Sequence, residues 1–164
     1  MHVSVVANRS MTAYAEVQSN LEQIAGRING TYGTLDWQPL AFISQPIPFV
    51  DLVAYYRASD VAWITPLADG MNLVCKEYVA SRVDGDGVLV LSEFAGAAVE
   101  LTAAVMTNPF SHRSMDTAIE QALSMDEAER RDRMAAMREV VRTADIRAWG
   151  DAQMAYGRKA VEAA

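Results

Sequence analysis

The sequence has very little of the chemistry that forms disulfides or holds metal ions. It contains a single cysteine, Cys75, and two histidines, His2 and His112. One thiol cannot close an intramolecular disulfide, and a cysteine cluster that would hold zinc is absent from the sequence. With only two histidines, a multi-histidine metal site is excluded as well. We therefore expect neither a metal site nor a bound cofactor.

Long apolar runs and an excess of positive charge are also missing. No hydrophobic run reaches the ~18 residues that a membrane span needs. The start of the chain, MHVSVVANRS, lacks the basic residues and apolar stretch of a signal peptide. The 14 basic and 21 acidic side chains give a net charge of −7, which argues against binding to nucleic acid or anionic membranes. We expect a cytoplasmic domain that binds neither.

What the sequence does contain is a domain's length of alternating strand and helix patterns. Its 164 residues are 51% hydrophobic, which is enough to bury a core. Short apolar runs, several of them rich in β-branched residues, predict strands at 2–7, 37–43, 61–65, 88–92 and 105–107. Helical patterns predict helices at 11–28, 49–57, 72–81, 97–101, 114–125, 126–142 and 145–162. Strands that alternate with helices imply a parallel sheet, so the predicted fold is α/β and Rossmann-like, with flanking helices.

Local signals predict how some of these elements begin, end and pack. Asn29 and Gly30 tolerate positive φ, which predicts the end of the first long helix there. Asp126 has Glu129 three residues later, the spacing of a capping box, and is the predicted N-cap of its helix. The continuous apolar run at 61–65 predicts a strand that is covered on both faces. From about residue 114 the chain is expected to be a helical tail.

Two loops are the predicted ligand-binding region, because ligands of parallel α/β sheets bind at the carboxyl ends of the strands. They are the loops at 66–72 and 93–97, and the first leads into a predicted helix. Asp69 could accept hydrogen bonds from sugar hydroxyls, Gly70 allows close backbone approach, and Glu77 could bind a ribose diol. The alternative is an aspartate that caps a helix and a glutamate on a solvated face. For the small residues that follow the strand at 88–92, simple tight packing is the alternative.

The stretches DGMNLVCKEYVA and GVLVLSEFAGAAVEL together are long and specific. They resemble the retaining glucosyltransferases of the trehalose-6-phosphate synthase family, which includes the glucosylglycerol-phosphate synthases. The resemblance extends over nearly the whole chain, from Asn29–Gly30 to Trp149. It implies that residues 1–164 are part of the C-terminal, nucleotide-sugar-binding half of a two-domain GT-B enzyme. The acceptor-binding N-terminal domain, with the family's catalytic histidine, and the Arg/Lys pair for the donor diphosphate are then expected outside this chain.

The resemblance also implies roles for the loop that precedes the helix at 72–81. Asp69 is expected to bind hydroxyls of the transferred glucose, as the residue closest to the chemistry. Gly70 and Met71 are expected to contribute backbone amides to the same sugar. The amides of Asn72 and Leu73 are expected to meet the diphosphate. No protein nucleophile is evident, and the donor phosphate is a candidate acceptor of the proton.

Further residues have roles implied by the same resemblance. Glu77 is expected to bind the ribose hydroxyls, and the backbone around Ile47 is expected to hydrogen-bond the base. Lys76 matches the family pattern without an assigned role, and a surface ion pair is the simpler interpretation. Cys75 is expected to be a small buried thiol rather than a reactive one.

Two enzyme activities and one non-catalytic role follow from the family. Ala68 stands where many trehalose-phosphate synthases have Arg, which favours glucosylglycerol-phosphate synthase, using ADP-glucose and glycerol 3-phosphate. The alternatives are trehalose-6-phosphate synthase, using UDP-glucose and glucose 6-phosphate, or a regulatory or assembly fragment. Without the acceptor domain, the isolated chain is expected to be inactive. Apolar surface left uncovered where the upstream part of this same domain, with its first strands, is missing would favour self-association into homo-oligomers.

Overall fold

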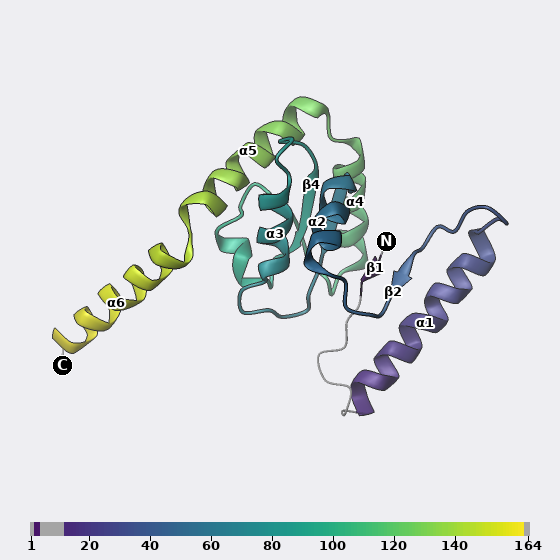
Figure 1. The fold of residues 1–164 in the computed structure, drawn as a ribbon, viewed down its shortest axis with the longest axis horizontal. Helices are drawn as coiled ribbons and strands as arrows, with labels where there is room; N and C mark the ends of the chain where they lie inside the picture. Colours follow the sequence, from purple (N-terminus) through teal and green to yellow (C-terminus); the bar gives the residue numbers. More distant parts are fainter. Residues whose placement is uncertain (1, 4–11, 163–164) are drawn as a thin grey trace. The chain divides into compact units, whose positions relative to one another are not determined.

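The chain forms two compact units, Met1–Pro48 and Phe49–Ala164. A computed structural model describes residues 2–3 and 12–162 (Figure 1). The smaller unit contains β1 (His2–Val3), α1 (Thr12–Tyr32) and β2 (Phe42–Ile43), and its two short strands pair in parallel. Beyond Val3, the strand expected at 2–7 lies outside the described residues.

Two sequence predictions for the smaller unit are wrong. Helix α1 does not end at Asn29–Gly30 but continues to Tyr32. The Asn29 side chain is engaged instead by the backbone of Leu40: its Nδ2 donates to the Leu40 oxygen at 2.8 Å, and its Oδ1 accepts from the Leu40 nitrogen at 3.0 Å. These two bonds occupy the backbone groups of Leu40. The strand expected at 37–43 is also shorter than predicted and comprises Phe42–Ile43.

The larger unit contains a parallel three-stranded sheet, as the sequence predicts. Its strands are β3 (Val61–Ile64), β4 (Val88–Ser92) and β5 (Val105–Thr107), in the order β3-β4-β5. The remaining elements are helical: α2 (Phe49–Ala58), α3 (Leu73–Ser81), the 3₁₀ turn η1 (Gly96–Val99), α4 (His112–Ser124), α5 (Glu127–Thr143) and α6 (Ile146–Glu162). Every helix predicted in this region is present within a few residues of its expected bounds.

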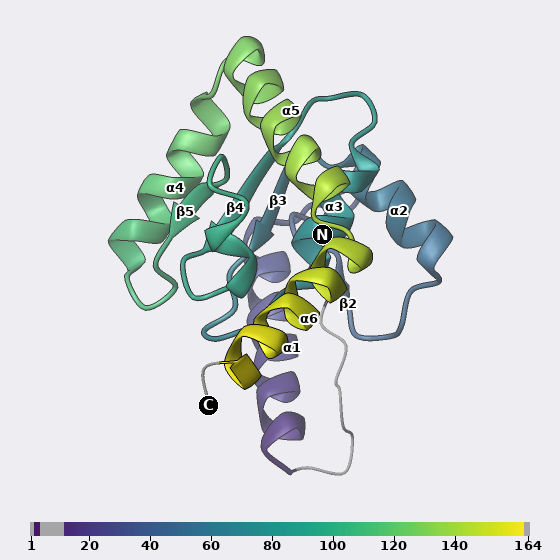
Figure 2. The same cartoon turned by 90° about the vertical axis from the view of Figure 1, so that its left-hand side faces the viewer.

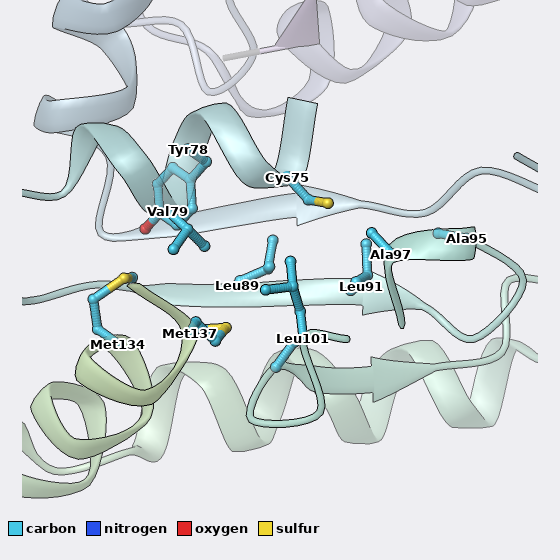
Figure 3. Close-up of a cluster of buried hydrophobic side chains, with 11 residues drawn as sticks. Cys75, Tyr78, Val79, Leu89, Leu91, Ala95, Ala97, Leu101, Met134 and Met137 are labelled. Atoms are coloured by element: carbon cyan, nitrogen blue, oxygen red, sulfur yellow. The ribbon is translucent and has the colours of Figure 1, made fainter. Parts of the chain in front are cut away.

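The core of this unit is built around β4, whose five residues are all buried. Alternate side chains point to opposite faces of a strand. Leu89 and Leu91 pack against residues of α3 and α5, whereas Val88 and Val90 pack against α4. In Figure 2 the strands accordingly lie between α3 and α4. Figure 3 shows the first cluster, with Met134 of α5 approaching the same face of β4 as α3.

Strand β3 is less covered than its sequence predicts. Its residues are half-buried or exposed, and the side chain of Trp63 is 39% exposed. Val61 packs against the cluster on one face of the sheet, and Ala62 and Ile64 pack against the cluster on the other, so the expected cover on both faces is present but incomplete. An apolar sequence records what a strand tolerates, and its position in the sheet decides what is actually covered.

The cap predicted for the helix after residue 125 is confirmed. The Asp126 side chain accepts from the Glu129 nitrogen at 2.8 Å, and α5 begins at the next residue, Glu127. None of the helices in the described ranges is both long and apolar enough to cross a lipid bilayer.

Candidate functional site

Asp69 lies in the loop that joins β3 to α3, and its carboxylate organises that loop. Its Oδ1 accepts from the Met71 nitrogen, and its Oδ2 accepts from Nδ2 of Asn72, both at 3.0 Å. The Met71 N–H, followed by the Asn72 amide, lowers the pKa of Asp69 below its usual value. The carboxylate is therefore charged at neutral pH. A carboxylate can accept about four hydrogen bonds, so it retains capacity for ligand hydroxyls.

Asn72 is the N-cap of α3, so this helix begins one residue later than the sequence predicts. Its Oδ1 accepts from the Cys75 nitrogen at 3.0 Å. Its φ of 68° is left-handed, the one such case at a non-glycine residue in the part of the chain that the structure describes. This conformation costs free energy, and the hydrogen bond from Asn72 to Asp69 helps to hold it. The N–H of Leu73, at the first helical position, has no acceptor within the helix and lies at the positive end of its dipole.

The second predicted loop lies directly against the first. The Asp69 nitrogen donates to the Phe94 oxygen at 3.2 Å, and the Gly96 nitrogen donates to the Asp69 oxygen at 2.8 Å. The Ala97 nitrogen donates to the Met71 oxygen at 2.7 Å. A Cβ on Gly96 would lie 2.1 Å from the oxygen of Gly70, which no packed structure allows. The small residues after β4 are therefore needed for close contact between the two loops, which is the packing role that the sequence left open.

Glu77 follows on α3, four residues after Leu73, so the two residues lie on the same side of the helix. The Tyr56 hydroxyl of α2 donates to Oε2 of Glu77 at 3.3 Å. Burial and the charge of Glu77 raise the pKa of Tyr56 to about 12, so the phenol remains a donor at neutral pH. This contact joins residues 21 positions apart, and no spacing in the sequence signals it.

The two residues before Glu77 have the structural roles that the sequence favoured. Nζ of Lys76 lies 2.6 Å from Oε2 of Glu100, so Lys76 forms a surface ion pair. Cys75 is fully buried, and its Sγ donates to the Asn72 oxygen at 3.0 Å. Burial raises the pKa of this thiol to about 11, which leaves it protonated and unreactive at neutral pH.

Ile47 belongs to the smaller unit, whereas Asp69 and Glu77 belong to the larger one. Its contact with the base therefore stays a prediction. Across residues 2–3 and 12–162, no three side chains of the His, Cys, Asp or Glu types come together as a metal site. The candidate site thus consists of one carboxylate-bearing loop, the start of one helix and one glutamate a turn further along that helix.

Known proteins resemble this chain in both sequence and structure. The model of glycosyltransferase family 20 matches residues 1–157. A glucosylglycerol-phosphate synthase of Synechocystis sp. is 45% identical over 88% of this chain and 29% of its own length. A trehalose-6-phosphate synthase of Klebsiella pneumoniae is 47% identical over 90% of this chain and 31% of its own length.

A solved structure shares the fold. It is a trehalose-6-phosphate structure from E. coli bound with UDP-2-fluoro glucose. It superposes with a TM-score of 0.87 at 44% identity, over 93% of this chain and 34% of that one. The chain thus spans about a third of the length of the proteins it matches.

Two expectations from the sequence are therefore confirmed, the GT-B fold class and the kinship with this group of glucosyltransferases. The match extends over almost all of the chain, and the aligned relatives are nearly half identical to it. The chain belongs to glycosyltransferase family 20.

Proposed function

We propose that this chain binds the nucleotide-sugar donor of a retaining glucosyltransferase that transfers glucose to a phosphorylated acceptor. One observation carries the proposal. The loop bearing Asp69, the start of α3 and Glu77 form a continuous series at the carboxyl edge of the sheet, where ligands of such folds bind. The acceptor and the residues around it belong to the proposal for the whole enzyme, of which this chain spans about a third.

The sugar, the diphosphate and the ribose of the donor each have a matching group in this series, and the group for the ribose hydroxyls is the Glu77 carboxylate. The charged carboxylate of Asp69 accepts hydrogen bonds from glucose hydroxyls, and the Gly70 N–H donates to the same sugar. The Met71 N–H already donates to Asp69, so it contributes to the sugar chiefly by orienting that carboxylate. The backbone N–H groups of Asn72 and Leu73 lie at the positive end of the α3 dipole and are proposed to donate to the diphosphate. This end stabilises the negative charge that develops on the departing nucleoside diphosphate.

Within the family, we favour glucosylglycerol-phosphate synthesis from ADP-glucose and glycerol 3-phosphate. The presence of Ala68 before the Asp-Gly pair supports this choice. Trehalose-6-phosphate synthesis from UDP-glucose and glucose 6-phosphate is the second candidate. The 47% identity to the Klebsiella trehalose-6-phosphate synthase and the similarity to the E. coli structure bound with a UDP sugar favour it. A purely regulatory or assembly role is least favoured, because the Asp69 loop and Glu77 are both intact.

Titration of the isotope-labelled chain with ADP-glucose and, separately, UDP-glucose tests the proposal by amide NMR. We expect shifts at residues 69–73 and at Glu77, and the nucleotide that binds more tightly identifies the branch. Removing the carboxylate in Glu77→Ala should weaken binding at least about tenfold, since hydrogen bonds to charged groups contribute roughly 1.5–3 kcal/mol. Glu120→Ala, on the exposed surface of α4, is the matched control and should bind like the parent chain. A folded chain whose amides at 69–77 do not respond to either nucleotide contradicts the proposal.

A further inference from the structure

Tyr56 lies outside the Asp69 loop and contacts a proposed donor-binding side chain, that of Glu77. Its hydroxyl donates to Oε2 of Glu77 at 3.3 Å. In the described part of the chain, this is the single hydrogen bond to the Glu77 carboxylate. A glutamate has three rotatable side-chain bonds, and a carboxylate held at one oxygen samples fewer of their conformations. Its other oxygen, Oε1, remains available to a ligand.

The tyrosine itself is held firmly by its neighbours. Its half-buried ring meets the ring of Tyr78 edge-on, with centroids 6.2 Å apart and an interplanar angle of 84°. Tyr78 is fully buried, and its hydroxyl donates to the Ser59 oxygen at 3.4 Å. The ring of Tyr56 is thus fixed from α3, the helix that also carries Glu77.

The backbone that carries Tyr56 is fixed by Arg82, which is only 5% exposed. Nη1 of Arg82 donates to the oxygen of Tyr56 at 3.3 Å and to that of Arg57 at 3.0 Å. These carbonyls are at the C-terminal end of α2, where backbone oxygens lack helical partners and a cation is favourable. Asp84 holds the guanidinium in turn through two hydrogen bonds, at 3.1 and 2.9 Å. Both the ring and the backbone of Tyr56 are therefore positioned before any ligand arrives.

We infer that Tyr56 is a positioning residue that orients the Glu77 carboxylate toward the ribose hydroxyls of a nucleoside diphosphate. This inference rests on the proposed function, because it assigns the Glu77 carboxylate to the ribose. A flexible glutamate would lose conformational freedom when it binds a diol. The hydrogen bond from Tyr56 already orders the side chain in the free protein, so less conformational entropy is lost on binding. Such ordering changes affinity by a few-fold to about tenfold for each side chain.

The alternative is that Tyr56 only packs between α2 and α3. The two roles differ in what the hydroxyl does. A packing role belongs to the ring, which Tyr56→Phe preserves along with its edge-on contact to Tyr78. A positioning role belongs to the hydroxyl and affects binding of the ribose alone. The loss of affinity in Tyr56→Phe must therefore be absent when the nucleotide has no ribose hydroxyls.

The experiment measures dissociation constants for ADP and for 2′,3′-dideoxy-ADP with the 164-residue chain. We expect Tyr56→Phe to weaken ADP binding about three- to tenfold and to leave dideoxy-ADP binding unchanged. Tyr55→Phe is the matched control on the same helix, since its side chain is 42% exposed, and it should affect neither nucleotide. Glu77→Ala should weaken ADP binding more than Tyr56→Phe does. Adding Tyr56→Phe to Glu77→Ala should cause no further loss, because the hydroxyl acts through the carboxylate.

The outcomes separate the inference from the function on which it rests. Equal losses for both nucleotides in Tyr56→Phe, or no loss for either, overturn the positioning role while the Glu77→Ala result stands. Additive losses in the double variant overturn it as well. If the parent chain binds ADP and dideoxy-ADP equally, or binds neither, the ribose assignment of Glu77 fails, and the inference fails with it.

Discussion

Substitution of Gly96 by alanine tests most directly how the two loops of the site depend on each other. Gly96 begins the 3₁₀ turn after β4, and its Cβ position lies 2.1 Å from the Gly70 oxygen and 2.6 Å from the Gly70 carbonyl carbon. Cβ contacts shorter than 3.0 Å are essentially never found in proteins. The obstructing atoms belong to backbone, so no side chain can rotate away. The loop must therefore move by about 1 Å, which exceeds what a packed contact absorbs without cost.

The cost follows from the hydrogen bonds that such a movement strains. The Gly96 nitrogen donates to the Asp69 oxygen, and the Ala97 nitrogen donates to the Met71 oxygen. Each bond contributes about 0.5–1.5 kcal/mol, and overpacking adds roughly 1–3 kcal/mol. We expect Gly96→Ala to lower the free energy of unfolding by about 3 kcal/mol, a large part of the 5–15 kcal/mol typical of a domain. Since the Asp69 backbone moves, donor binding should weaken as well.

Native-state hydrogen exchange at Leu89 and Leu91 of β4 measures the stability of the larger unit by itself. A loss of about 3 kcal/mol corresponds to exchange roughly a hundredfold faster when exchange reports the opening equilibrium. Gly70→Ala is the matched control, because nothing lies within 4 Å of its Cβ position, and its effect on stability should stay within about 1 kcal/mol. If Gly96→Ala exchanges at the parent rate and its amides at 69–71 are unshifted, the close contact between the loops is wrong.

Three further predictions follow from the described contacts. Asn72→Ala should destabilise the chain by about 1–2 kcal/mol more than Asn72→Gly, because both variants lose the side-chain cap but only alanine is strained at the left-handed φ of 68°. Equal urea midpoints would contradict this. The hydrogen bond from Arg130 holds the pKa of Asp86 at about 2, below its unfolded value, so this stabilisation is complete above about pH 4 and is lost toward pH 2. The difference in unfolding midpoint between the parent and Asp86→Asn should shrink as the pH falls over that range. A constant difference would show that the Asp86–Arg130 ion pair does not stabilise the fold. Burial raises the pKa of Cys75 to about 11, so a thiol reagent at pH 8 should modify the unfolded chain readily and the folded chain hardly at all; equal rates would show that the thiol is exposed.

The residues of the site were predictable because they are close together in sequence. Asp69 and Glu77 are eight positions apart, and the pattern between them signals a strand end, a tight loop and a helix start. Asp126 and its helix were predictable for the same reason, since a cap requires only an acceptor side chain and an N–H three residues later. Hydrogen bonds of this kind form within one local segment and depend little on the rest of the chain.

The larger errors in the predicted elements concern how the segments pack in three dimensions. Asn29 looked like a helix end, but the backbone of Leu40 occupies its side chain and α1 continues past it. The strand expected at 37–43 comprises only Phe42–Ile43. Trp63 was expected to be buried, but β3 lies at the edge of the sheet in the described structure. For Asn29 a tertiary contact outweighed a weak local preference, whereas for Trp63 the described residues simply leave the strand only partly covered.

The sequence by itself determined the α/β class, the order of the elements and the loops at the carboxyl ends of the strands. These depend on periodicity, turn chemistry and residue type, which act over a few positions, whereas the roles proposed for the donor-binding residues rest on the resemblance to the family. Only the tertiary structure decided that the second loop lies against the first and that Tyr56 contacts Glu77. It also decided that Lys76 pairs with Glu100. Such contacts join segments about 20 to 30 residues apart, and they are set by how helices pack on the sheet, for which no local pattern carries a signal.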